Sequence, residues 1–142
     1  GADVSSPLYA GAREALARLK EQDEILLGVA TGKSRRGLDK LIEAHGLAKT
    51  FLTQQVADDH PSKPNPSMLL QAMHELGVEA RDMVMIGDTS FDMDMARAAG
   101  VHFIAVSWGY HETSRLAGAD VVIEDFAQLD GALDLIWSKA NG

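Results

Sequence analysis

Two aspartates four residues apart form the clearest chemical signal in this sequence. Asp88 comes directly after the apolar run "MVMIG", and Asp92 follows it in "GDTSFD". If a helix begins here, residues four apart lie on one face of it. Two carboxylates at the end of a buried strand suit Mg²⁺, which also accepts water and phosphate oxygens as ligands. The competing interpretation is structural: Asp88 would cap the helix, and the helix dipole would favour Asp92.

A second candidate group lies in the segment "LLGVATGKS". The segment is similar to a nucleotide-binding phosphate loop, but that pattern requires a glycine where Leu27 stands. We expect instead that the Thr31 hydroxyl and the unpaired amides of Gly32 and Lys33 bind phosphate at the start of a helix. The alternative is that Thr31 and Ser34 only cap that helix.

A third candidate is Lys63, which lies among prolines in "DDHPSKPNP". Proline fixes the backbone angle φ, so a rigid loop would hold the ammonium group at little entropic cost. A lysine is a compact positive charge that suits a phosphate. The alternative is a solvated surface lysine, which is the commoner case. His60, in the same segment, is a lesser candidate for this site.

The overall composition narrows the class of protein. A chain of 142 residues predicts a single domain over residues 1–142. The net charge of −8 argues against a nucleic-acid surface, and the absence of cysteine excludes disulfides, thiolate zinc sites and cysteine nucleophiles. No apolar run approaches the ~18 residues of a membrane span, and no signal peptide is visible. We therefore expect a cytoplasmic protein with no membrane or nucleic-acid partner.

The elements that must position these residues alternate between helix and strand. Apolar runs predict strands at residues 25–30, 50–57, 83–86, 103–106 and 121–123. Helical spacing predicts helices near residues 12–19, 34–46, 69–77, 91–100 and 126–136, with a short one around Leu116. This order predicts an α/β fold, a Rossmann-like three-layer sandwich with a mostly parallel sheet. The continuous apolar run 25–30 indicates a strand buried on both faces. Ligands of such sheets bind at the carboxyl ends of the strands, where all three candidate groups fall.

Taken in order, these motifs resemble those of the haloacid dehalogenase-like (HAD-like) hydrolases, particularly the phosphoglycolate-phosphatase-like branch. "LLGVATGKS" is similar to the second family motif, "KPNPSMLLQAMHELG" to the third and "GDTSFDMDMARAAG" to the fourth. The resemblance implies a Mg²⁺-dependent phosphatase that acts on a small phosphorylated metabolite through an aspartyl-phosphate. It implies that Thr31 holds the phosphate, with Lys63 neutralising charge on the phosphate and nucleophile. It also implies that Asp88 ligates the metal, with Asp92 beside it as a direct or indirect ligand.

The nucleophile motif of the family has no counterpart in this sequence. That motif is an apolar strand ending in Asp-x-Asp-Gly, whereas the only Asp-x-Asp here is Asp92-Met93-Asp94, inside an expected helix. The substrate-selecting cap that follows the motif is also absent, so no particular substrate is predicted. We expect the chain to be inactive by itself, through truncation first and as a natural pseudo-phosphatase second. Because the nucleophile strand is central in the family fold, its loss should leave open sheet edges, repack the sheet or promote self-association.

Three other functions remain as alternatives. A receiver-like signalling domain also uses strand-end aspartates, a threonine and a lysine, but here Lys63-Pro64 precedes the acidic strand end rather than following it. A dehalogenase of the same superfamily needs no metal, and the pair of Asp88 and Asp92 speaks against it. A catalytically dead domain that binds phosphate or metal fits the missing nucleophile.

Overall fold

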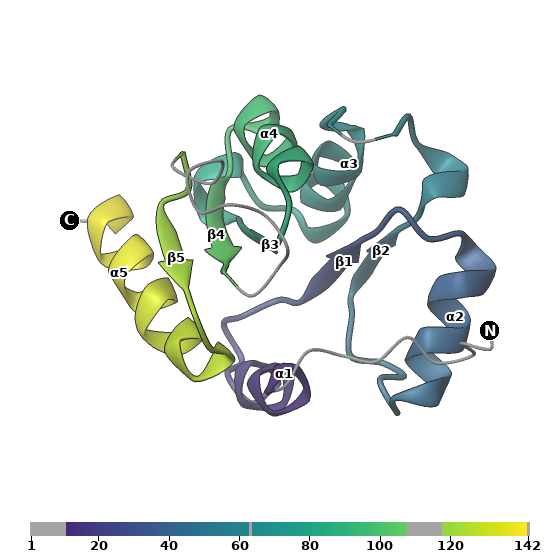
Figure 1. The fold of residues 1–142 in the computed structure, drawn as a ribbon, viewed down its shortest axis with the longest axis horizontal. Helices are drawn as coiled ribbons and strands as arrows, with labels where there is room; N and C mark the ends of the chain where they lie inside the picture. The colour runs from purple at the N-terminus through teal and green to yellow at the C-terminus, as the bar shows by residue number, and fades with distance from the viewer. Residues whose placement is uncertain (1–10, 63, 108–117, 142) are drawn as a thin grey trace.

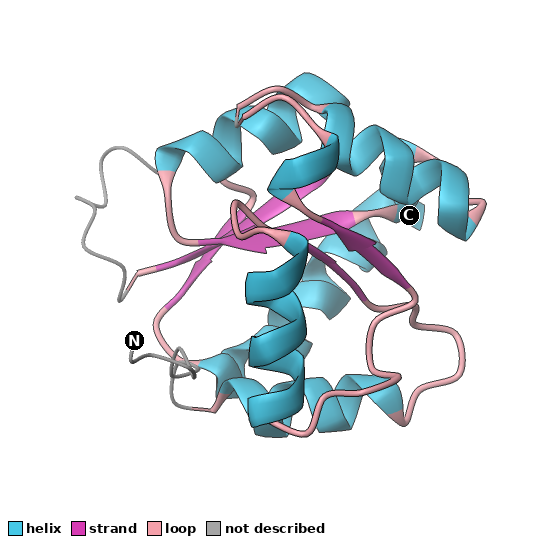
Figure 2. Cartoon of the chain, turned by 90° about the vertical axis from the view of Figure 1, so that its right-hand side faces the viewer, coloured by secondary structure: helices cyan, strands magenta, loops and turns pink. Residues whose placement is uncertain are grey.

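The computed structural model describes residues 11–62, 64–107 and 118–141, in which parallel strands lie between layers of helices (Figures 1 and 2). One sheet pairs β1 (Gly28–Ala30) with β2 (Thr53–Gln55), and a second has the order β3 (Val84–Gly87), β4 (His102–Val106), β5 (Val121–Ile123). All three strand pairs are parallel. The helices are α1 (Ala12–Lys20), α2 (Arg35–Ala44), α3 (Ser67–Leu76), α4 (Ser90–Ala99) and α5 (Leu129–Asn141). The predicted α/β fold with parallel strands is confirmed.

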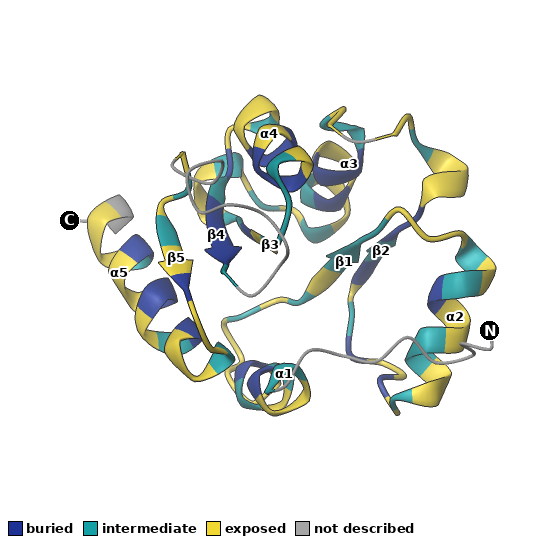
Figure 3. Ribbon diagram, viewed as in Figure 1, coloured by how far each residue is buried: buried dark blue, intermediate teal, exposed yellow. Residues whose placement is uncertain are grey.

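The hydrophobic core lies on both faces of β4. Phe103 and Ala105 face a cluster built with α3 and α4, whereas Ile104 and Val106 face a cluster built with α1 and α5. Side chains alternate between the two faces of a strand, so a strand covered by helices on both sides is apolar throughout. Figure 3 shows β4 and the inward faces of α4 and α5 as buried.

Local signals placed most helix ends correctly. Ser34 caps α2, and Gly77 and Gly100 end α3 and α4 with φ angles of 69° and 76°. These positive φ values suit glycine, which has no Cβ to clash with the backbone. The short helix expected around Leu116 lies outside the described residues.

The prediction for residues 25–30 is wrong in length and in burial. The strand covers only Gly28–Ala30, and Gly28 is exposed while its two neighbours are half-buried. The side chain of Leu26 is 44% exposed. The cause is the position of β1, which pairs with β2 alone and has its other edge open. The second strand is also shorter than expected, because a 3₁₀ turn, η1 (Ala57–Asp59), follows it closely.

The sheet is divided between β1 and β3, which pair with β2 and β4 respectively and not with each other. The expectation that two strands would have open edges is therefore confirmed for the described residues. Self-association through these edges stays a prediction. Within the same ranges, every helix is too short or too polar to cross a membrane.

Candidate functional site

Asp88 stands at the carboxyl end of β3, between Gly87 and the start of α4. The N-cap of α4 is Thr89, whose Oγ1 accepts a hydrogen bond of 3.1 Å from the amide of Asp92. The alternative that Asp88 caps this helix is therefore wrong. The N-cap role therefore does not explain Asp88, which follows the carboxyl end of β3, where ligands of parallel sheets bind.

Asp92 is nearly completely buried, with 5% of its surface exposed. A Cβ atom built on Gly87 would lie 2.7 Å from both Cβ and Oδ2 of Asp92. Only glycine therefore lets this carboxyl group pack against the last residue of β3. This packing explains the glycine at position 87, because a larger residue there would keep the carboxylate of Asp92 away from the end of β3.

Thr31 follows the last residue of β1 and is held at both its amide and its hydroxyl. Its amide donates to the Gln55 carbonyl at 3.0 Å, and its Oγ1 accepts from the Lys33 amide at 3.1 Å. The prediction that the Lys33 amide is an unpaired donor is thus wrong, because the Thr31 side chain folds back onto it. The Thr31 hydroxyl can still donate its own proton, since a hydroxyl accepts and donates at once.

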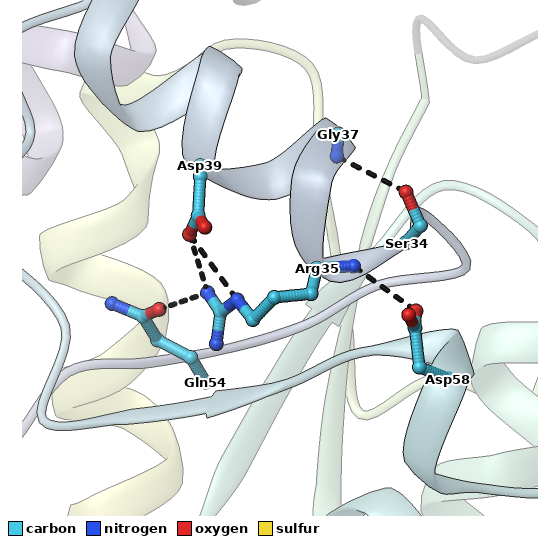
Figure 4. Close-up of polar contacts among 6 residues, drawn as sticks. All are labelled: Ser34, Arg35, Gly37, Asp39, Gln54 and Asp58. Atoms are coloured by element: carbon cyan, nitrogen blue, oxygen red, sulfur yellow. Dashed lines mark hydrogen bonds and ion pairs between the residues drawn. The ribbon is translucent and has the colours of Figure 1, made fainter.

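Asp58 is a residue that sequence reasoning missed. Its Oδ1 accepts a 3.0 Å hydrogen bond from the Arg35 amide in the first turn of α2, beside the Ser34 cap (Figure 4). The neighbouring Ala57 amide donates to the Lys33 carbonyl at 3.0 Å. The segments after β1 and β2 are therefore joined, and a carboxylate lies at the helix end where a phosphate was expected. The pairing spans 23 positions of sequence, so no local pattern signals it.

The guanidinium of Arg35 lies along the same helix. It forms an ion pair of 3.0 Å with Asp39, one turn later in α2, and a hydrogen bond with the Gln54 side chain on β2 (Figure 4). These contacts tie the first turn of α2 to the sheet. Together with the hydrogen bond from the Arg35 amide to Asp58, these contacts fix the start of α2, which lies a few residues after Thr31.

Lys63 lies outside the described residues, so its predicted role stays a prediction. His60, three positions earlier, contacts Ser67 through Nδ1 at 2.7 Å and Gln55 through Nε2 at 2.8 Å. Both ring nitrogens are thus engaged with neutral side chains of the fold. His60 anchors the segment between β2 and α3 rather than offering a nitrogen to a ligand.

A chain of polar side chains continues from Gln55 beneath β2. Gln55 Nε2 donates to Thr53 Oγ1 at 2.8 Å, and the Thr53 hydroxyl donates to Glu75 Oε1 at 2.6 Å. Both residues on β2 are buried, being 2% and 4% exposed. The hydrogen bond from Thr53, and a second from Gln71, lower the pKa of Glu75 below its ordinary value of 4.5. Hydrogen bonds to an ionised carboxylate favour the charged form.

The site residues therefore fall on two strand ends that belong to different sheets. Thr31 follows β1 and Asp88 follows β3, each at the predicted carboxyl end. In the described part of the chain, no three histidine, aspartate or glutamate side chains form a group that could hold a metal ion. Two carboxylates still fit Mg²⁺, which commonly binds one or two carboxylates and completes its shell with water and phosphate.

Comparisons with known proteins identify the family of this chain. The sequence pattern described as "Haloacid dehalogenase-like hydrolase" matches residues 2–106. "Probable phosphatase IndB" from Dickeya dadantii is 41% identical over 88% of this chain and 55% of its own length. A phosphoglycolate phosphatase from Photobacterium profundum is 33% identical over 91% of this chain and 57% of its own length. The chain thus spans just over half the length of these relatives.

The fold comparison points the same way. The crystal structure of a HAD-superfamily hydrolase from Geobacter sulfurreducens superposes with a TM-score of 0.73 at 28% identity, covering 86% of this chain and 58% of that one. The three motifs and the strands β1 to β4 all lie within residues 2–106, which the family pattern matches. The chain belongs to the haloacid dehalogenase-like hydrolases.

Proposed function

We propose that this chain is the core of a Mg²⁺-dependent phosphatase that hydrolyses a small phosphorylated metabolite through an aspartyl-phosphate. The observation that carries the proposal is the arrangement at the end of β3. There Thr89 supplies the helix cap, and Gly87 makes room for the buried Asp92, so one carboxylate packs against the last residue of β3 and Asp88 follows directly after that residue. Residues 1–142 contain no Asp-x-Asp-Gly, so the nucleophile must come from outside them.

Each described residue has a defined task in this proposal. Asp88 and Asp92 would hold Mg²⁺, which when bound neutralises charge on the phosphoryl group. The Thr31 hydroxyl would donate to a phosphate oxygen, and the amide of Gly32 would add to the positive end of α2. Lys63 would supply a further positive charge. Such charge is needed because Asp58 places a carboxylate at the same helix end.

Metal binding is the first test, since it does not need the nucleophile. Titration of the chain with Mg²⁺ in a calorimeter, in the presence of inorganic phosphate, should show saturable binding. Asp88→Asn should abolish it. Asp94→Asn is the matched control, because Asp94 lies in the same helix but is exposed, and it should bind Mg²⁺ as the parent does. Equal binding by both variants would remove Asp88 from the site.

Turnover is the second test. The chain alone should not hydrolyse p-nitrophenyl phosphate or phosphoglycolate, the latter chosen because several relatives are named phosphoglycolate phosphatase. Adding a peptide that contains an apolar strand ending in Asp-x-Asp-Gly should produce Mg²⁺-dependent hydrolysis. Mg²⁺-dependent turnover by the chain alone, lost in Asp88→Asn, would contradict the need for an outside nucleophile.

A second candidate function follows from the absent Asp-x-Asp-Gly. A catalytically dead phosphate- and metal-binding domain would use the same Thr31 and Asp88. It would retain Mg²⁺ and phosphate binding but gain no turnover with any nucleophile peptide. The two tests together therefore separate the enzyme core from the binding domain.

A further inference from the structure

Side chains of β2, of α3 and of the segment between them form one continuous chain of hydrogen bonds. In order, its members are Glu75, Thr53, Gln55, His60 and Ser67, and the contacts between them measure 2.6, 2.8, 2.8 and 2.7 Å. Both ends of this hydrogen-bond chain lie on α3, with Ser67 in its first turn and Glu75 in its last. Each inner member has a partner on either side, so the donor at one end determines which atom donates at every other contact.

Glu75 sets the direction of the hydrogen-bond chain. Hydrogen bonds from the side chains of Thr53 and Gln71 lower the pKa of this carboxyl group below 4.5, so it is ionised at neutral pH and can only accept. The Thr53 hydroxyl has a single proton, which it donates to Glu75. Thr53 Oγ1 must therefore accept from its other neighbour, the amide nitrogen of Gln55.

The orientation of the Gln55 amide in turn fixes the proton of His60. The Gln55 carbonyl oxygen faces Nε2 of His60 at 2.8 Å and can only accept, so Nε2 carries the proton. In a neutral imidazole Nδ1 is then the acceptor, and the Ser67 hydroxyl donates to it. Gln55 is buried, so a reversed amide would leave its oxygen facing Thr53 without a donor. The hydrogen-bond network thus assigns the tautomer of His60.

The contact between His60 and Ser67 joins the two ends of the segment 61–66. Within this segment the Asn65 amide donates to the Ser62 carbonyl at 3.1 Å. The Asn65 side chain also accepts from the Ser67 amide at 2.9 Å. The described residues of the segment therefore turn back on themselves, and the contact between the two side chains closes the segment at its base. Such a closure removes extended conformations of the segment.

We propose that Glu75 is a positioning residue for the phosphate site. Through the buried side chains of β2 it fixes the proton of His60 on Nε2. The Nδ1 atom of His60 then holds Ser67, which keeps the segment 61–66 closed. The proposal rests on the proposed function in one respect, namely that Lys63 of this segment binds phosphate. A closed segment confines its lysine before phosphate arrives, so less conformational entropy is lost on binding.

The tautomer of His60 is the first test, and it requires no ligand. Nitrogen-15 NMR of the 142-residue chain at about pH 8, where an ordinary imidazole is neutral, should show the proton on Nε2. The signals lost in His60→Asn identify this ring among the histidines. Glu75→Gln replaces a group that only accepts by an amide that can also donate, so the hydrogen-bond chain can reverse. A second set of signals, with the proton on Nδ1, should then appear.

Gln71→Ala is the matched control for Glu75→Gln. The Gln71 side chain donates to the other carboxylate oxygen of Glu75 at 3.1 Å but lies outside the hydrogen-bond chain. Its loss should leave the proton of His60 on Nε2. The control therefore separates the direction of the hydrogen-bond chain from any general change around α3.

The affinity for phosphate is the second test, measured by calorimetry with inorganic phosphate and Mg²⁺. Ser67→Ala opens the base of the segment but leaves His60 bonded to Gln55, and it should weaken phosphate binding about tenfold. Ser67→Thr keeps a hydroxyl at the same position and should bind phosphate as the parent does. A purely structural role of Ser67 would lower the Tm of Ser67→Ala without changing its phosphate affinity.

Three results would overturn the proposal. The first is a proton on Nδ1 of His60 in the parent chain, and the second is the same tautomer in Glu75→Gln as in the parent. The third is equal phosphate affinity of Ser67→Ala and the parent. Absence of phosphate binding by the parent would overturn the proposed function and this role with it, whereas the NMR results decide the direction of the hydrogen-bond chain by themselves.

Discussion

The two sheets of this molecule bury different kinds of side chain. In the β3–β4–β5 sheet, the central strand is apolar and fully covered, with Phe103, Ile104 and Ala105 each at most 1% exposed. In the β1–β2 sheet, the buried positions of β2 are Thr53 and Gln55. Hydrophobic contacts are non-directional, whereas buried polar groups require partners with correct geometry. The first sheet should therefore respond to lost volume and the second to lost hydrogen bonds.

The largest expected effect tests the position of β4 between two partners. Ile104→Ala removes a fully buried side chain and should lower the free energy of unfolding by about 2–5 kcal/mol. Ile86→Ala, on the open edge of β3, should cost clearly less than Ile104→Ala, because 36% of the surface of Ile86 is already exposed to water. Urea denaturation of both variants measures the difference. Equal losses would mean that the edge of β3 is covered in solution.

The glycine at the end of β3 gives the next largest effect. Gly87→Ala should cost about 1–3 kcal/mol, because the new methyl group collides with the buried Asp92. It should also weaken Mg²⁺ binding. Gly32→Ala is the matched control, since nothing lies within 4 Å of the position of its Cβ, and it should change stability by less than about 0.5 kcal/mol. Thermal unfolding that shows no difference would contradict the close packing of Asp92.

The polar sheet should be sensitive to a substitution that preserves volume. Thr53→Val replaces the hydroxyl that joins Gln55 to Glu75 and should cost about 1–2 kcal/mol, because the buried Gln55 amide loses its acceptor. Thr50→Val changes a buried threonine outside this chain of hydrogen bonds and should cost less. The ratio of the two losses in urea denaturation measures what the network contributes. A neutral Thr53→Val would show that β2 is held by packing alone.

The smallest effect is a pH dependence confined to the polar sheet. The folded pKa of Glu75 is lowered, so its contribution to stability is complete above the unfolded value of 4.5 and is lost as the pH falls through the folded value. The Tm should therefore fall on acidification below about pH 4.5, and Glu75→Gln should reduce the size of that fall. The change should be modest, because Glu75 is largely exposed and water screens it. An unchanged acid profile in the variant would contradict the lowered pKa.

Much of the fold could be predicted because its signals are local. The apolar residues 103–106 and the helix spacing of residues 91–100 predicted β4 and α4 to within a residue. For residues 25–30 the same reasoning predicted a longer and fully buried strand, and that prediction failed, although these residues are as apolar as residues 103–106. Full burial of a strand requires a helix layer on each face and a paired strand at each edge, and apolar composition alone cannot show whether those neighbours exist.

The residues of the candidate site show the same difference between local and distant signals. Asp88 and Thr31 were found because a polar residue directly after an apolar strand is visible in one dimension. The Asp58 cap on α2 was not, because its partner lies 23 positions away. The hydrogen bond that the Lys33 amide donates to the Thr31 hydroxyl also escaped prediction, since the side-chain rotamer of Thr31 decides it.

By itself, the sequence determined the family, the order of helices and strands, and the strand ends that carry Thr31 and Asp88, because each depends on spacing along the chain. Only the tertiary structure decided that Thr89 caps α4, that Asp92 packs against Gly87, and that β1 and β3 line one cavity without pairing with each other. These features depend on which distant surfaces meet. Close packing and backbone pairing are settled only once the chain is folded.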